Sequence, residues 1–220
     1  MKFFDISNIF FELWGYPMSY LEFFGTVAGF MAVYLASRAH IWSWPLGLIN
    51  VTLFFFLFYQ VQLYPDMFLQ IFFFITNILG WWRWAHPKPF EEDKKKQLKV
   101  SYMPARHLLA LLLAGVAGTV LFGSLASRLH EWFPVLFGKP SAFPYLDSFV
   151  TVMSIITTFL MIQKKIESWI IWIVVDVVAT YMYYMKEIRF VAFEYLIFCF
   201  IAAYGFWNWR REHRSYNIRL

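Results

Sequence analysis

Residues that could bind a ligand interrupt an otherwise apolar run near the end of this sequence. Trp169, Trp172, Asp176, Thr180 and Tyr183 recur at spacings of three or four residues, which places them on one face of a helix. Aromatic rings stack on flat ligands and attract cations, while a carboxylate accepts hydrogen bonds from hydroxyl groups or balances a positive charge. The pattern therefore predicts a face that binds a flat ligand rather than a face that contacts lipid.

Similar patterns occur in other apolar runs: Gln70, Asn77 and Trp81 share one helical face. The predicted substrate-binding residues are Asn50, Gln70, Asn77, Trp81, Trp172, Asp176, Tyr183, Glu194 and Asn208. A lone amide in an apolar helix also holds neighbouring helices together, so this alternative stays open for Asn50 and Asn77. Glu194 could instead pair with Lys186 or Arg189.

Motifs for catalysis and for metal binding are missing. The sequence has no Gly-rich loop followed by GKS or GKT, and its five His residues are scattered without metal-ligand spacing. Its single cysteine, Cys199, forms no intrachain disulfide. We therefore expect no catalytic residue, no metal site and no cofactor, and a protein that is not an enzyme.

The composition is that of a membrane protein. Hydrophobic residues make up 60% of the 220 residues and charged residues 15%, whereas soluble domains have about 25% charged residues. Apolar runs of about 20 residues predict helices that cross the bilayer. The predicted spans are 19–37, 43–62, 65–84, 107–127, 145–163, 169–186 and 189–209. Residues 3–14 are expected to form a short interfacial helix, with an eighth span as the weaker alternative.

Basic residues in the connections predict the orientation, because Lys and Arg are enriched on the cytoplasmic side. One side holds Arg38, Arg83, Lys88, Lys94, Lys95, Lys96, Lys99, Arg106, Lys164, Lys165, Arg210, Arg211, Arg214 and Arg219. The N-terminus is then outside and the C-terminus cytoplasmic. The net charge of +5 reflects this topology, and no nucleic-acid partner is expected.

An internal repeat suggests the architecture. Residues 20–27 match 145–152, and residues 80–84 match 205–209, both at an offset of 125 residues. Asn50 is matched with Asp176, which requires one inserted residue between these anchors. Two three-helix units joined by one extra span lie parallel, with a substrate site expected near the membrane midplane between them. The predicted divisions are 1–17, 18–86 (first repeat), 87–106 (cytoplasmic linker), 107–127 (linker span), 144–210 (second repeat) and 211–220 (cytoplasmic tail).

The predicted fold class is an all-α membrane protein with a 3+1+3 arrangement similar to that of the SWEET sugar transporters. Together with the Trp-rich starts of spans two and six and the pattern Gln70-x6-Asn77-x2-Gly80-Trp81, it resembles the PnuC family of nicotinamide riboside transporters. The Trp spacing differs between the halves, 42 and 44 against 169 and 172. The resemblance implies a homotrimer in the bacterial inner membrane and facilitated diffusion, with the substrate trapped by a cytoplasmic kinase.

The expected ligand suits the residues. Nicotinamide riboside carries a cationic ring, for which Trp81, Trp172 and Tyr183 are the predicted stacking residues. The expected mechanism is alternating access, with Gly25, Gly29, Pro45 and Gly47 giving flexibility in the first half. A carrier of another vitamin such as thiamine is the alternative, and a channel is a weaker one because the spans contain few polar residues. The partners expected are this small molecule and the lipid bilayer.

Overall fold

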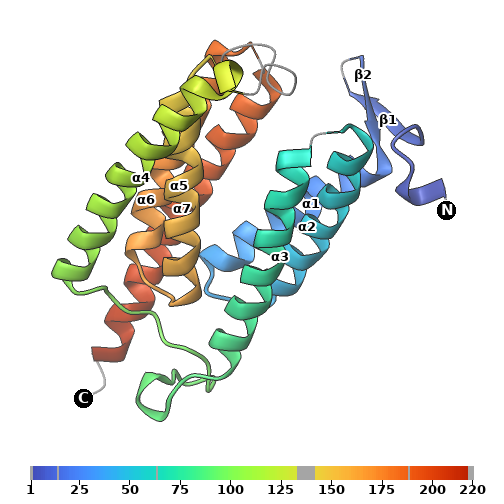
Figure 1. The fold of residues 1–220 in the computed structure, drawn as a ribbon. Coiled ribbons are helices and arrows are strands. Elements are labelled where there is room, and N and C mark those ends of the chain that lie inside the picture. The colour runs from blue at the N-terminus through green and yellow to red at the C-terminus, as the bar shows by residue number, and fades with distance from the viewer. Residues whose placement is uncertain (1, 14, 63, 133–141, 188, 218–220) are drawn as a thin grey trace. The chain divides into compact units, whose positions relative to one another are not determined.

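The computed structural model describes residues 2–13, 15–62, 64–132, 142–187 and 189–217. These residues form seven α-helices, two short 3-10 helices and one two-stranded sheet. In chain order (Figure 1) they are η1 (Lys2–Phe4), β1 (Ile9–Leu13), β2 (Tyr16–Ser19), α1 (Tyr20–Ser37), α2 (Ser43–Gln60), α3 (Tyr64–Ala85), η2 (Pro89–Glu91), α4 (Ala105–Trp132), α5 (Pro144–Ile162), α6 (Glu167–Met185) and α7 (Arg189–Asn217).

Each predicted span corresponds to one of the helices α1 to α7, with starts that agree within two residues. Six of these helices, all except α3, are long and apolar enough to cross a membrane. Helix α3 has 22 residues, but Gln70, Asn77, Arg83 and several tryptophans lower its mean hydropathy. Helix α7 continues beyond its predicted end to Asn217, so the expected tail from residue 211 is helical as far as the structure describes it.

The N-terminal segment is a β-hairpin, so the prediction of a short helix over residues 3–14 is wrong. Strands β1 and β2 pair antiparallel, with Ile9 opposite Ser19, and Gly15 lies between them at φ 82°. Glycine adopts such positive φ values without strain, and aromatic and β-branched residues favour strands. Figure 1 shows the hairpin at one end of the α1–α3 bundle.

The chain divides into two compact units, residues 1–99 and 100–220. In the first unit α2 packs against both α1 and α3. In the second unit α6 packs against both α5 and α7, and α4 packs against α5. Helix α2 in the first unit and helix α6 in the second therefore each hold two neighbouring helices in place.

The turns of the two units match at a constant offset of 125 residues. Ala39 and Lys164 both have positive φ, 53° and 54°, and Gln62 and Glu187 both have φ 60°. The backbone bonds around them also correspond, as in His40 N–H to Leu35 O and Lys165 N–H to Leu160 O. The same offset before and after α2 leaves no room for an inserted residue.

This register corrects one prediction. Asn50 and Asp176 are not equivalent, because Asn50 corresponds to Val175 and Asp176 to Val51. In this register the Trp spacing differs between the units: Trp44 corresponds to Trp169, but Trp42 corresponds to Glu167 and Trp172 to Gly47.

A pair of tryptophans packs at matched positions in both units. The rings of Trp44 and Trp84 meet edge to face with centroids 5.2 Å apart, and those of Trp169 and Trp209 do so at 5.4 Å. A Cβ at the glycine one turn before the second tryptophan would collide with the first tryptophan; at Gly205 it would lie 2.7 Å from the Trp169 ring. All four tryptophans are buried. Glycine and two indoles therefore set how closely the second and third helices of each unit approach.

The connection between the units is more ordered than the predicted linker. Glu91 accepts a hydrogen bond from Arg83 at 2.7 Å, and Leu98 N–H donates to Trp84 O at 3.0 Å. Burial works to raise the pKa of the Glu91 carboxyl, but its hydrogen bonds to the Arg83 guanidinium and the Lys88 N–H lower that pKa overall. Leu98 and Val100 are buried, so this segment packs on the helices.

Candidate functional site

The predicted ligand face of α6 is turned inward. Trp169 and Asp176 are buried and Trp172, Thr180 and Tyr183 are partly buried. The opposite side of α6 is exposed and apolar, at Ile170, Val174, Val177, Tyr181 and Tyr184. An exposed apolar stripe is the surface expected where a helix faces lipid. The polar and aromatic face of α6 therefore lies on the protein side of the helix.

Asp176 lies in the middle of this face and is only 4% exposed. Among the described residues no Lys or Arg forms an ion pair with its carboxylate. Its backbone oxygen accepts a hydrogen bond from the Thr180 hydroxyl at 2.7 Å. A buried carboxylate without a cation is costly, and such residues within membrane helices commonly mark binding sites.

Aromatic residues lie two turns further along α6. The rings of Tyr183 and Tyr195 stack with centroids 5.4 Å apart and an angle of 10° between their planes. The Lys186 ammonium lies 5.6 Å from the Tyr183 ring centroid and forms an ion pair with Asp147 at 2.7 Å. Lys186 is therefore bound to the first turn of α5, rather than to Glu194 as the alternative reading allowed.

Asn50 and Asn77 each contribute to packing in the first unit. Asn50 Nδ2 donates to Gly25 O on α1 at 2.8 Å, and a Cβ at Gly29 would lie 2.8 Å from this nitrogen. Asn77 Nδ2 donates to Phe73 O within α3 at 2.8 Å, and its Oδ1 faces Gly47 so closely that a Cβ there would collide. These contacts favour the packing alternative for Asn50. A side chain at Gly29 or Gly47 would meet these amides, so both positions require glycine for close packing.

The other predicted residues are distributed along α3, α6 and α7. Trp81 is 43% exposed, and Gln70, Glu194 and Asn208 are partly buried. Trp172 packs against the cluster formed by Met153, Leu160, Ile171 and Val175. The structure thus groups Trp172, Asp176 and Tyr183 on one helix, whereas the meeting of the α3 and α6 faces stays a prediction.

The repeat equivalences separate two kinds of residues. Tryptophan and glycine of the packing motif occur in both units. The polar residues do not: Asp176 corresponds to Val51, and Asn77 corresponds to Ala202. The two units therefore share the packing motif, whereas the predicted ligand-binding residues are not repeated between them.

Two residues with clear roles were missed by the sequence reasoning. Tyr195 stacks on Tyr183 but was overlooked beside the charged Glu194. Glu167, at the start of α6, is 8% exposed and accepts the Met103 N–H with both carboxylate oxygens, at 3.0 and 3.1 Å.

Six helices that are long and apolar enough to cross a bilayer define a multi-pass membrane protein. Residues 19–211 match the family model of the nicotinamide mononucleotide transporters, and the chain belongs to this family. It is accordingly a transporter and not an enzyme.

Several named relatives align over most of the chain. The "Nicotinamide riboside transporter PnuC" of Escherichia coli is 33% identical, and the match covers 100% of this chain and 98% of that protein. The PnuC protein of Neisseria mucosa is 26% identical over 89% of this chain and 73% of that protein. A riboflavin/roseoflavin transporter, RibM of Streptomyces davaonensis, is 23% identical over 93% of this chain and 92% of that protein.

A solved structure shares the fold. The "Crystal structure of the Vitamin B3 transporter PnuC" superposes with a TM-score of 0.66, covering 89% of this chain and 83% of that chain at 24% sequence identity. The similarity to PnuC transporters confirms the family to which the sequence motifs pointed.

Proposed function

We propose that this protein carries nicotinamide riboside across the bacterial inner membrane. The proposal is supported by the 33% identity to the Escherichia coli transporter over the whole chain. The observation that carries it is Asp176, a buried carboxylate with no cationic partner among the described residues. A cationic ligand would supply the missing positive charge.

The ligand matches the residues of α6 in several respects. Its pyridinium ring is flat and cationic, so it can stack on Trp172 or on Tyr183 and pair with Asp176. Its ribose hydroxyls and carboxamide both donate and accept hydrogen bonds, as the amides of Gln70 and Asn77 do. Trp81, Glu194 and Asn208 complete the proposed set of ligand-binding residues.

The proposed topology has the two three-helix units parallel, with α4 as the linker span, as in SWEET transporters. The basic connections then lie in the cytoplasm and the N-terminal hairpin outside. Transport is facilitated diffusion by alternating access in each protomer of a homotrimer, and a cytoplasmic kinase traps the product. The absence of ATP-binding motifs supports a passive mechanism.

Riboflavin is the second candidate substrate, because the RibM relative transports it and aligns over 93% of this chain. The two vitamins differ in charge: riboflavin is neutral, whereas nicotinamide riboside is a cation. Asp176 favours the cation, since burying a carboxylate beside a neutral ring leaves the negative charge unbalanced.

Binding to the purified protein tests the proposal. Calorimetric titration with nicotinamide riboside, nicotinamide, thiamine and riboflavin should show the tightest binding for nicotinamide riboside. Tighter binding of riboflavin would assign the protein to the second candidate. Binding of none of the four would contradict a vitamin carrier.

A further inference from the structure

A short segment before α4 is bound to the start of α6. The Ser101 N–H donates to Lys164 O at 3.1 Å, and the Ile166 N–H donates to Ser101 O at 3.0 Å, as in a parallel strand pair. The Lys165 ammonium donates to the Ser101 hydroxyl at 2.8 Å. Three bonds therefore join one residue of the connection to the turn between α5 and α6.

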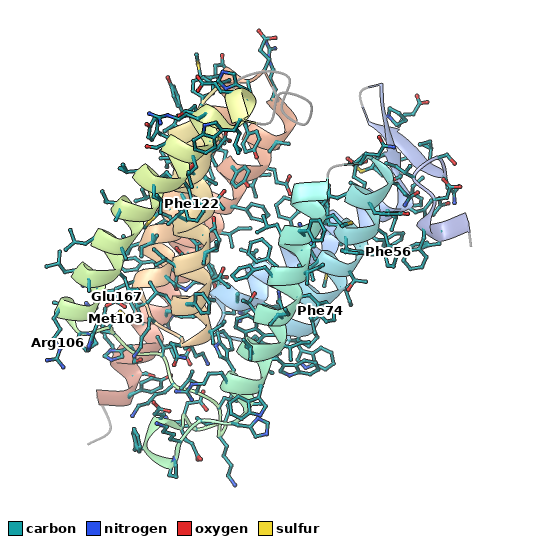
Figure 2. The ribbon with its side chains drawn as sticks, in the orientation of Figure 1. Phe56, Phe74, Met103, Arg106, Phe122 and Glu167 are labelled. Carbon is teal, nitrogen blue, oxygen red and sulfur yellow. The ribbon has the colours of Figure 1, made fainter. Side chains whose placement is uncertain are left out.

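Glu167 extends this contact to Met103, two residues after Ser101. Its carboxylate accepts the Met103 N–H with both oxygens, and Figure 2 labels Glu167 and Met103 side by side. Glu167 is the first residue of α6, where a negative charge is favourable beside the free N–H groups of the helix. Since Glu167 is buried, this bond is shielded from water.

The end of α7 contacts the same segment. The Val100 N–H donates to the Tyr216 hydroxyl at 3.4 Å, and that hydroxyl donates to Glu212 at 3.0 Å. The ring of Tyr102 meets the His213 ring edge to face with centroids 4.9 Å apart. Residues 100–103 thus contact the α5–α6 turn, the start of α6 and the end of α7.

The first unit has the same turn, but among the described residues no segment is hydrogen-bonded to the Ile41 amide there. Ala39, His40, Ile41 and Trp42 correspond to Lys164, Lys165, Ile166 and Glu167, and their turn bonds match. Within the described ranges, however, the Ile41 N–H donates no hydrogen bond, whereas the Ile166 N–H donates to Ser101. Trp42, at the position of Glu167, is 62% exposed.

We propose that residues 100–103 form a clamp that fixes the α5–α6 turn of the second unit, which carries Lys164 and Lys165. Glu167 is then a positioning residue for the ligand face of α6. Nine residues separate Glu167 from Asp176, about 13 Å along the helix, so a shift at the start of α6 moves Asp176. The unclamped turn of the first unit is then the one that moves during transport. The part of this inference that concerns transport rests on the proposed function.

Hydrogen exchange tests the clamp without any transport assay. Ile41 and Ile166 have the same side chain in matched turns, but the Ile166 amide is bonded to Ser101 and Ile166 is also the more buried of the two. The Ile166 amide should exchange at least about tenfold more slowly than the Ile41 amide, as expected for a shielded hydrogen bond. Equal exchange in the unmodified protein would overturn the proposal.

Variants at the matched positions separate positioning from a general loss of structure. Glu167→Ala should accelerate exchange at Met103 and Ile166, and Glu167→Gln should restore most of the protection because its amide oxygen still accepts a hydrogen bond. Trp42→Ala is the matched control and should leave both amides unchanged. If Glu167→Ala fails to fold, the Gln variant and the unmodified protein still decide the outcome.

Uptake by the same variants tests the positioning role. Glu167→Ala should raise KM for nicotinamide riboside by about three- to tenfold, which corresponds to the net free energy of one typical hydrogen bond. Its kcat should change by less than about twofold. A fall in kcat at unchanged KM would contradict positioning. If the unmodified protein takes up no nicotinamide riboside, the proposed function fails while the exchange result on the clamp stands.

Discussion

Replacing Asp176 by asparagine should weaken binding of a cationic ligand while it stabilises the empty protein. The side chain is 4% exposed and has no cationic partner among the described residues, so its charge is available to the ligand. A unit charge pair at about 4 Å is worth about 4 kcal/mol at an effective dielectric constant of about 20. Part of this is lost to desolvation, and the net worth of a charged contact is about 1.5 to 3 kcal/mol.

This free energy corresponds to a Kd for nicotinamide riboside that is roughly 10- to 100-fold higher in Asp176→Asn. Nicotinamide, which has no charge, should bind with unchanged affinity. The empty variant should unfold at a higher temperature, by about 2 to 4 °C for each 1 kcal/mol gained, because a buried unpaired carboxylate is removed.

Calorimetric titration and thermal unfolding in the same detergent measure both effects. Glu91→Gln is the control, because Glu91 is a partly exposed carboxylate outside the membrane helices that is already paired with Arg83. It should leave the Kd unchanged. Wild-type affinity for nicotinamide riboside in Asp176→Asn, or an equal loss for nicotinamide, would refute the assignment of Asp176 as the counter-charge.

Three further predictions concern stability. Gly205→Ala should destabilise the protein by about 1 to 3 kcal/mol, measured by thermal unfolding, because its Cβ would lie 2.7 Å from the Trp169 ring; unchanged unfolding would contradict the close packing. Gln60→Ala should expose the segment before the hairpin to limited proteolysis, because the Gln60 amide donates to Phe4 O at 2.7 Å and accepts from the Ile6 N–H at 3.0 Å. Unchanged cleavage would show that these bonds are dispensable. Because the pKa of Glu91 is lowered, the Arg83–Glu91 pair stabilises the fold above pH about 4.5, and this stabilisation is lost as the pH falls through the lowered pKa. The Arg83 side-chain NMR signal should therefore shift only below pH about 4.5. Glu91→Gln is the control, in which this signal should not shift.

Hydropathy was sufficient to predict the helices, because the cost of unsatisfied backbone groups in lipid requires long apolar helices. The inward face of α6 was likewise predictable, since its residues recur with helical spacing. The repeat was found, but its register was misread between the anchors. Matching Asn50 with Asp176 by polarity ignored the turns, whose positive φ at Ala39 and Lys164 sets the alignment.

Features made by backbone bonding could not be predicted in this way. The clamp depends on the N–H and C=O of Ser101, groups that every residue except proline carries, so no side-chain pattern reveals it. The hairpin was missed because residues 3–14 are aromatic and mixed, a composition that also suits an interfacial helix. Packing roles of Gly29 and Gly47 depend on the facing amides of Asn50 and Asn77, which only the arrangement in space shows.

Uptake into proteoliposomes tests the central claim most directly. The purified protein, reconstituted without kinase or ATP, should equilibrate labelled nicotinamide riboside across the membrane with saturable kinetics, and an excess of unlabelled nicotinamide riboside on the far side should accelerate exchange. Flux that rises linearly without saturation would indicate a channel. No flux above that of protein-free liposomes would contradict the account.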